Sequence, residues 1–595
     1  MEYRRIVTRR YIAPFLVAIF FLSTVPIAVT QGTTQPFVLS MPNTQPPNQP
    51  TNIPQWVIDP QIKSKVGDGD LETQIPVIIR LKDNVTIDMA EELDKLSYLQ
   101  VERNKDGSPY ILNFGNIHMV VAKVTGYKNL EAFVNQHKDE ILFVEGNYPA
   151  PVPESVESKS SLGIVAKADD TIKWYLDFID APQVWQKQVH GVNITGLGVN
   201  IAMLDSGIDD WCFETPEGNY SKPGGDIWYQ IDALAGWNNR VEYYTPGWSG
   251  IDPVPDTHPL GKPHGTGTAA VAAGGKGYGV APQANLIDIR VFATWSMWDS
   301  ARLSSAIHWC VDHGVDVISM SLGDNINSHP TVWDAIEYAY FSGVPVCVAA
   351  GNGNNAPYSI WDPGVAKYAI TVMGCFQNGN PSTATSFGPT SDKRPKPEII
   401  APSADEAAGT TSFATPCVSG TAALLVQYLM LTGQQRKYRG VLVRAAIIRA
   451  AALHDIGDPG WEYNHGHGYL NALDAYKYLS GEYSYDLHAY ATKWRKGIVT
   501  PDYWYLVWVW WPWPWGSWIP RYGWYVYTAV ESDGQLEPYK ITLVDSAPSG
   551  ADVVSGNPYR EWTSVDRHQY FNSYTVEAWI THITFLQPYA VASYT

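Results

Sequence analysis

The sequence predicts an α/β fold: a parallel sheet with helices on both faces, preceded by a small α+β unit and followed by a β-sandwich-like unit. Three observations predict it. In the middle of the chain, near-continuous apolar runs alternate with helical stretches. An earlier segment has the order β-α-β-β-α-β, and after about Ser480 strand-forming residues dominate without a long helical pattern. At 595 residues the chain is also too long for one hydrophobic core.

Apolar runs from Gly196 onward form the predicted parallel sheet. Helical stretches around Ser300–Gly314 and Thr331–Ser342 separate them. Strands that are apolar throughout are buried on both faces, which is typical of a parallel sheet covered by helices. Reactive groups in such sheets lie at the carboxyl ends of the strands. The expected strands are Val199–Leu204, Asn285–Phe292, Val315–Leu322, Val344–Ala349 and Tyr368–Gly374.

The α+β unit before the sheet has the ferredoxin-like order. A Pro-rich linker, Gln31–Pro60, precedes it, and a loose stretch from Pro149 to about Asp170, where we expect cleavage, follows it. The expected elements are a strand at Ile75–Leu81, a helix at Ile87–Gln100, paired strands at Tyr110–Phe114 and His118–Val124, a helix at Leu130–His137 and a strand at Ile141–Glu145.

The first 30 residues have the three parts of an export signal. A basic start with Arg4, Arg5, Arg9 and Arg10 is followed by the uncharged apolar run Ile12–Val29 and by small residues suited to cleavage. A retained membrane anchor is the alternative. Prolines in the apolar run and the polar stretch after it favour cleavage, so we expect a secreted, extracellular or cell-surface protein.

Charge and cysteine content limit the classes of function that the chain can have. A formal net charge of −18 argues against a nucleic-acid partner, because phosphate binding needs an excess of Lys and Arg. The 5 cysteines are too few for a disulfide scaffold, and an odd number cannot all pair within one chain. The sequence leaves open whether any of them forms a bridge.

Residues 481–595 form the predicted β-rich C-terminal unit. Its segment Tyr503–Pro520 is uncharged and rich in tryptophan, and it is just long enough to span a membrane. Pro512, Pro514 and Pro520 would interrupt a spanning helix, so a hairpin packed in the sandwich is the favoured interpretation. The alternative is a binding surface for a membrane or cell surface, a glycan or a partner.

Four residues follow apolar strands or begin helices and could carry chemistry. Asp205 ends an apolar strand in Leu-Asp-Ser-Gly, and Asn352 follows another in Ala-Ala-Gly-Asn. His264 and Ser412 each stand where a small-residue helix begins. Taken singly they have ordinary explanations, because Asp-Gly and Asn are common in turns and Ser is a common helix cap. A helix N-terminus also favours the negative charge of a tetrahedral intermediate.

Together these motifs resemble the subtilisin-like (subtilase) serine peptidases, from roughly Trp174 to Tyr476. The Asp, His, Ser order is theirs and differs from the order in other serine peptidase folds. Further strings fall in family order: Gly279-Val-Ala-Pro282, Ser319-Met-Ser-Leu-Gly323, Ser386-Phe-Gly-Pro-Thr390, Lys396-Pro-Glu-Ile-Ile-Ala-Pro402 and Gly466-His-Gly-Tyr-Leu-Asn-Ala472.

The resemblance implies a role for each residue. Asp205, His264 and Ser412 would form a catalytic triad, and Asn352 would donate to the oxyanion. Ser319, Ser321, Leu322 and Gly323 would bind an extended protein or peptide substrate. Residues 31–165 would be an inhibitory propeptide with a folded core at 75–148, and residues 166–480 the catalytic domain. The chain would therefore be a self-processed precursor, inhibited by its own propeptide.

The chain departs from the family pattern in several places. Gly267 stands where a second His is usual, Thr410 stands where Gly is usual, and the stretch from Pro402 to Ser412 is short. A Gly-, Pro- and Trp-rich insertion, Cys212–Pro263, separates Asp205 from His264. These changes bear on the shape of the cleft. Every reacting residue is present.

No cofactor is required for this chemistry, and calcium is a candidate structural ion by resemblance. Acidic side chains of the right type lie in and before the insertion, although no ligand loop can be assigned: Asp209, Asp210, Glu214, Glu217 and Asp226. Two other functions compete with a serine peptidase. One is a non-catalytic binding module, and the other is an aspartic peptidase, which would need a second copy of the Asp-Ser-Gly motif.

Overall fold

The computed structural model describes residues 56–82, 85, 89–104, 107–115, 117–150, 172–209, 212, 227–232, 256, 263–275, 277–292, 298–325, 328–391, 396–404, 409–455 and 462–482, and the backbone of the strands between 488 and 594. The predicted signal segment, the linker up to residue 55 and most of the predicted cleavage region lie outside these residues.

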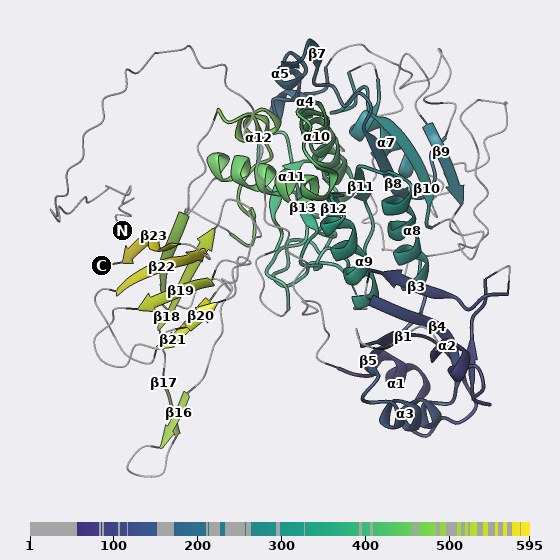
Figure 1. Ribbon diagram of the computed structural model, residues 1–595. Coiled ribbons are helices and arrows are strands. Elements are labelled where there is room, and N and C mark those ends of the chain that lie inside the picture. Colours follow the sequence, from purple (N-terminus) through teal and green to yellow (C-terminus); the bar gives the residue numbers. More distant parts are fainter. Residues whose placement is uncertain are drawn as a thin grey trace, which may run out of the picture.

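A seven-stranded sheet forms the centre of the molecule (Figure 1). Its order is β14-β13-β12-β11-β8-β10-β9, and every neighbouring pair is parallel. The five predicted strands are confirmed with small changes at their ends, whereas β9 and β14 were not predicted. The strands are β8 (Asn200–Asp205), β9 (Ile227–Asp232), β10 (Asn285–Arg290), β11 (Val317–Met320), β12 (Val346–Ala349), β13 (Ile370–Cys375) and β14 (Ile399–Pro402).

Helices cover both faces of this sheet. Ile201 and Met203 of β8 pack into one hydrophobic cluster with α7, α10, α11 and α12, whereas Ala202 and Leu204 pack into a second cluster with α8 and α9. Alternate residues of one strand thus face opposite sides, as its apolar sequence predicts. The main helices are α7 (Gly265–Ala273), α8 (Ser300–Asp312), α9 (Pro330–Phe341), α10 (Thr411–Leu431), α11 (Arg436–Ala451) and α12 (Ala472–Leu479); α4 (Trp174–Phe178) and α5 (Ala181–Trp185) are short.

Helix α10 is the longest of these and lies in the core. It is the one helix among the described residues that is long and apolar enough to cross a membrane, and 89% of that apolar window is buried inside the molecule. Close packing allows this position: a Cβ added at Gly420 would stand 2.5 Å from Cβ of Val280 and 2.7 Å from the carbonyl oxygen of Ala272 in α7. Helix α10 is therefore a core helix of the domain.

The amino-terminal unit is an antiparallel sheet with helices. Its order is β2-β4-β1-β5, with β3 paired to β4. Its strands are β1 (Gln74–Leu81), β2 (Leu99–Val101), β3 (Ile111–Phe114), β4 (Ile117–Thr125) and β5 (Ile141–Gly146), and its helices are α1 (Pro60–Val66), α2 (Met89–Leu93) and α3 (Tyr127–Gln136).

For two segments of this unit the predicted boundaries are wrong. The helix expected at Ile87–Gln100 ends as α2 at Leu93, because Leu99 and Val101 are buried on one face of strand β2 while Gln100 is exposed. The expected linker also ends early. Asp59 caps α1 by accepting a hydrogen bond from the Gln61 N–H, so residues just before Pro60 already belong to the folded unit.

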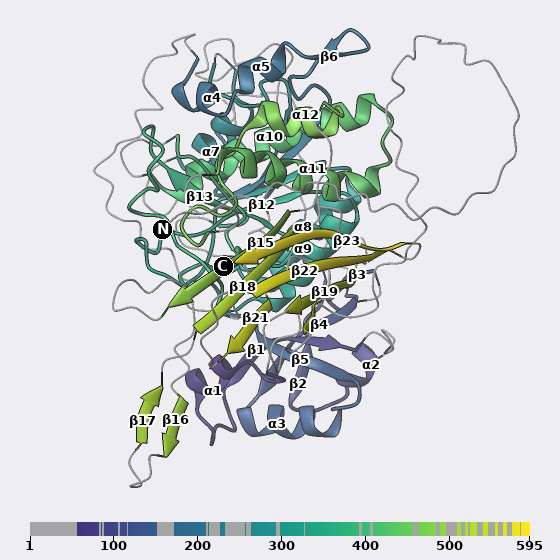
Figure 2. The same ribbon diagram turned by 90° about the vertical axis from the view of Figure 1, so that its left-hand side faces the viewer.

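This unit packs against helices α8 and α9 of the central domain (Figures 1 and 2). Phe114 of β3 contacts the rings of His308 in α8 and Tyr338 in α9, with centroid distances of 5.7 Å and 5.9 Å. Leu112, Phe114 and Met119 belong to the same buried cluster as residues of the central sheet. The two units therefore share a hydrophobic core.

The C-terminal part consists of strands in three sheets with the orders β15-β18-β21, β16-β17 and β20-β19-β22-β23. The hairpin predicted in the tryptophan-rich segment is present, but it forms a two-stranded sheet of its own and does not extend the larger sheets (Figure 1). Its packing inside a sandwich stays a prediction. The strands are β15 (His488–Arg495), β16 (Val509–Pro512), β17 (Trp518–Arg521), β18 (Trp524–Glu531), β19 (Lys540–Asp545), β20 (Val554–Gly556), β21 (Thr563–Arg567), β22 (Tyr574–His582) and β23 (Phe585–Tyr594).

Candidate active site

Asp205 is the last residue of β8 and lies at the carboxyl edge of the central sheet. Its side chain is buried, with 1% of the residue exposed. Oδ1 accepts a hydrogen bond from the Ser206 N–H at 2.8 Å, and Oδ2 accepts one from Thr268 Oγ1 at 3.1 Å. Two fixed donors therefore orient the carboxylate before any other group approaches it.

His264 stands directly before helix α7 and pairs with this carboxylate. Its Nδ1 lies 2.7 Å from Asp205 Oδ1. A Cβ on the next residue, Gly265, would collide with the carbonyl oxygen of Gly207, so only glycine lets α7 come this close to the end of β8. The glycine directly after His264 thus has a steric reason.

The surroundings of His264 favour its protonated form. Burial by itself would lower the pKa of the imidazole. The charge of Asp205, the hydrogen bond to Asp205 and the charge of Asp256 together outweigh burial, and they raise the pKa of His264 above its ordinary value. An imidazolium formed during a reaction would be stabilised in the same way.

Ser412 lies in the first turn of α10, next to this pair. The ring of Phe413, the following residue, contacts the ring of His264 with a centroid distance of 5.8 Å. Ser321 Oγ donates to the Ser412 carbonyl oxygen at 2.8 Å, which links the helix start to the end of β11. The fold therefore brings Asp205, His264 and the start of α10 together from three distant parts of the chain.

Asn352 follows β12 and is attached to the same helix start. Its Oδ1 accepts hydrogen bonds from the N–H and the Oγ1 of Thr411, both at 3.1 Å. The carbonyl half of the amide is thus occupied by the residue before Ser412. This arrangement leaves the amide N–H₂ to act as the donor, which suits binding of an oxyanion formed beside Ser412.

The predicted substrate segment divides into two parts. Ser319 is buried in β11, and its Oγ accepts a hydrogen bond from Ser419 Oγ of α10 at 2.7 Å, so its side chain serves packing between strand and helix. Ser321, Leu322 and Gly323 follow the strand at the carboxyl edge of the sheet, where the other candidate residues lie.

Sequence reasoning missed Asp256, Thr268 and Thr411 as neighbours of the site. Thr268 and Thr411 are one helical turn and one residue away from His264 and Ser412, so their positions were readable from the predicted helix starts. Asp256 lies inside the long insertion, where no local pattern distinguishes it from other acidic residues.

No group of three or more His, Cys, Asp or Glu side chains placed to hold a metal ion occurs in the described part of the chain. Of the acidic residues considered for calcium, Asp209 is described, and its Oδ1 accepts from the Asp256 N–H at 3.0 Å. The other four lie outside the described residues. All five cysteines are buried free thiols.

Comparison with known proteins decides the family. The subtilase family model matches residues 196–468. Thermitase of Thermoactinomyces vulgaris is 30% identical to this chain over 257 residues, which cover 42% of the chain and 79% of thermitase. The chain belongs to the subtilase family. The resemblance drawn from the motifs is thereby confirmed, and so is the parallel α/β fold it implied.

Other subtilases match over smaller parts of their length. Serine protease AprX of Bacillus subtilis (strain 168) is 30% identical over 283 residues, 40% of this chain and 59% of AprX. Minor extracellular protease Epr of the same organism is 26% identical over 57% of this chain and 49% of Epr. This subtilase thus spans about half the length of these two relatives.

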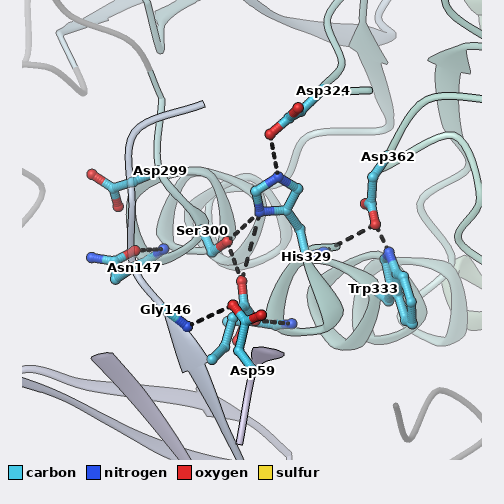
Figure 3. A network of polar contacts seen from close by, with 12 residues as sticks. Asp59, Gly146, Asn147, Asp299, Ser300, Asp324, His329, Trp333 and Asp362 are labelled. Carbon is cyan, nitrogen blue, oxygen red and sulfur yellow. Dashed lines mark hydrogen bonds and ion pairs between the residues drawn. The ribbon is translucent and has the colours of Figure 1, made fainter. Parts of the chain in front are cut away.

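A second polar site lies where the amino-terminal unit of this subtilase meets the central domain (Figure 3). Glu145 of β5 is fully buried, and it accepts hydrogen bonds from Ser300 Oγ at the start of α8 and from the Thr331 N–H at the start of α9, the latter at 2.9 Å. One carboxylate thus caps two helices of the other unit, where their dipoles favour negative charge.

His329 lies beside that carboxylate. Its Nδ1 is 2.8 Å from Ser300 Oγ and 3.7 Å from Glu145 Oε1, and its Nε2 is 3.1 Å from Asp324 Oδ2. Burial would lower the pKa of His329, but the hydrogen bonds to Asp324 and Glu145 and the charges of Asp362 and Glu145 raise it to about 10. A buried imidazolium therefore stands between carboxylates of the two units.

Proposed function

We propose that this subtilase is a secreted serine endopeptidase, synthesised as a self-processed precursor, that hydrolyses peptide bonds through an acyl-enzyme on Ser412. The observation that carries the proposal is the Asp205–His264 pair, with 2.7 Å between Oδ1 and Nδ1, which lies beside the start of α10, the helix that holds Ser412. The names of AprX, a serine protease, and Epr, an extracellular protease, support the same activity and location.

The chemistry follows from the residue types. His264 takes the proton of Ser412 as the hydroxyl attacks the peptide carbonyl, and then passes it to the leaving amine. Asp205 holds the imidazole in the required tautomer and stabilises its charged form. The amide of Asn352 and backbone N–H groups at the start of α10 bind the oxyanion. Water then hydrolyses the acyl-enzyme and frees Ser412.

The amino-terminal unit is proposed to be the inhibitory propeptide. Its buried carboxylate Glu145 and the hydrogen bond from the Ala150 N–H to the Trp298 carbonyl, 2.9 Å long, attach the end of the unit to the catalytic domain. The segment that follows can then lie along the cleft as a substrate. A scissile bond held in the same chain as the nucleophile makes the first cut intramolecular, which lowers its entropic cost.

An activity-directed fluorophosphonate tests the catalytic part of the proposal. The wild-type protein should be labelled on Ser412, and Ser412→Ala should not be labelled. A wild-type protein that resists the label while a statine inhibitor blocks its proteolysis would indicate an aspartic peptidase. A protein inert in both assays would be a binding module.

Intact-mass measurement of the same two proteins tests self-processing. Both are expressed without other peptidases. The wild type should lose the residues up to about 165, while Ser412→Ala should keep them after removal of the signal. Equal processing of the two proteins would mean that another enzyme matures this one.

A further inference from the structure

Asp256 lies next to the Asp205–His264 pair and forms hydrogen bonds with residues that follow each of the two. Its Oδ1 accepts a hydrogen bond from Ser206 Oγ at 2.6 Å, and its Oδ2 accepts one from the Thr266 N–H at 2.8 Å. Ser206 follows Asp205 in the chain, and Thr266 is two residues after His264. One carboxylate therefore connects the end of β8 with the first turn of α7.

The hydroxyl of Ser206 stands at the centre of these contacts. It accepts a hydrogen bond from the Gly265 N–H at 3.0 Å and lies 3.3 Å from Asp205 Oδ1, farther than the 2.6 Å to Asp256. The shorter of the two contacts is with Asp256, so the hydroxyl donates mainly to Asp256 and only weakly to Asp205. The closest side-chain contact of Asp205 Oδ1 is then the one with Nδ1 of His264, at 2.7 Å.

The charged groups around this cluster come from the loop after β8 and from β10. Asp209 and Asp288 accept the backbone N–H groups of Asp256 and Ile208, and Arg290 at the end of β10 is in register with Asp205. Burial is the main reason why the pKa of Asp256 rises, to about 6, with hydrogen bonds from Ser206 and Thr266 opposing it. The carboxylate is therefore ionised at and above neutral pH.

We infer that Asp256 is a positioning residue for the proposed peptidase reaction: it orients Ser206 and the start of α7, and its charge supports the imidazolium of His264. The inference rests on the proposed function. The insertion that separates Asp205 from His264 in sequence would then take part in catalysis, because it places one carboxylate, that of Asp256, beside the site.

The test is the pH dependence of fluorophosphonate labelling and of kcat/KM for the full-length chain, allowed to mature. The reaction needs neutral His264, so both rates fall as the pH drops through its pKa. Asp256→Asn removes a negative charge that raises this pKa. The acid limb should therefore move to lower pH, by about 0.5–1 unit. At the plateau kcat/KM should fall by about tenfold, because an amide cannot accept from both Ser206 and Thr266.

Two further variants complete the test. Ser206→Ala leaves the carboxylate but removes a hydrogen bond that lowers its pKa; it should shift the acid limb in the same direction by less, and it decides the matter if Asp256→Asn does not fold. Asp316→Asn is the control. Asp316 is a buried aspartate that accepts from the Asn200 N–H at 3.0 Å, at the opposite end of β8, and its loss should leave the acid limb unchanged.

The outcomes separate the inference from the proposed function. Wild-type labelling with an unshifted acid limb in folded Asp256→Asn would overturn the positioning role and leave the peptidase intact. An equal shift in Asp316→Asn would assign the effect to general destabilisation and also overturn it. Absence of wild-type labelling at every pH would instead remove the proposed function.

Discussion

Single residues in this site are held by hydrogen bonds, some from the next residue in the chain and some from distant residues. Ser206 donates its N–H to Asp205, and Thr411, which precedes Ser412, donates two hydrogen bonds to Asn352. These contacts orient the candidate catalytic side chains before substrate arrives. Groups that are already oriented need not rearrange during the reaction. This preorganisation is the main source of electrostatic stabilisation of a transition state.

Asn352→Ala should lower kcat by about 10²–10³-fold with little change in KM, because its amide contacts charge that exists mainly in the transition state. That magnitude is the one known for a subtilisin. Steady-state kinetics of the folded variant measures it. Asn354→Ala is the control, since that exposed residue lies two positions further on. Unchanged turnover in Asn352→Ala would exclude Asn352 from the oxyanion site.

Elements of the two units are joined by charge as well as by apolar packing. Glu145 at the end of β5 caps α8 and α9 together, and Arg80 of β1 pairs with Asp334 of α9 at 3.2 Å, both side chains being buried. Removal of one partner from such a pair leaves an uncompensated buried charge. These contacts should therefore hold the amino-terminal unit in one orientation.

Glu145→Gln should loosen the starts of α8 and α9 in full-length Ser412→Ala protein. A glutamine has one acceptor oxygen, so either the Ser300 hydroxyl or the Thr331 N–H loses its acceptor, and a hydrogen bond to a charged group is worth about 1.5–3 kcal/mol. Hydrogen–deuterium exchange there should be roughly 10–100-fold faster. Glu140→Gln is the control, because Glu140 is half-buried and pairs with His137 in its own unit. Equal exchange in both variants would contradict a capping role.

The same contact should depend on pH. The pKa of His329 is raised to about 10, so the stability it contributes is fully present below the ordinary histidine pKa, about 6.5, and is lost as the pH rises through about 10. Thermal denaturation of Ser412→Ala protein between pH 7 and pH 10 measures this. As the pH rises, the Tm of the Ser412→Ala protein should fall more steeply than the Tm of the same protein carrying His329→Gln. In the second protein only the other titrating groups contribute to the fall. Parallel curves would show that His329 does not carry a charge here.

On the scale of the whole molecule, the candidate catalytic residues all precede the C-terminal strands. Helix α12 ends at Leu479, and Glu482 just beyond it pairs with Lys187 at 3.5 Å. The strands from β15 to β23 pair with one another and not with the central sheet. The described backbone therefore divides the chain after residue 482.

A chain ending at residue 482 should still cleave small peptides. The truncation keeps α12 and the Lys187–Glu482 pair, and the β-rich part has its own sheets. Comparison of kcat/KM for a peptide with that of the full chain measures the effect, which we expect to be less than about threefold. A soluble, folded truncation with no activity would show that the C-terminal strands help to form the cleft.

The sequence by itself determined the family, the parallel sheet and the candidate triad. Apolar strands alternate with helices, and Asp205, His264 and Ser412 stand in short motifs at strand or helix ends. Such local patterns are readable because each reflects one turn, one cap or one buried run. Part of strand β2 was predicted as helix. The strand has three residues, which are too few to show the alternation of buried and exposed side chains that identifies a strand.

Only the tertiary structure decided which distant groups meet. Asp256 comes from an insertion without a motif, and Glu145, His329 and Asp324 come together across two units that the sequence separates by about 180 residues. Their roles depend on distance and burial, which strengthen charge interactions inside the protein. Neither quantity is encoded in neighbouring residues, because chain folding alone brings these carboxylates and imidazoles into contact.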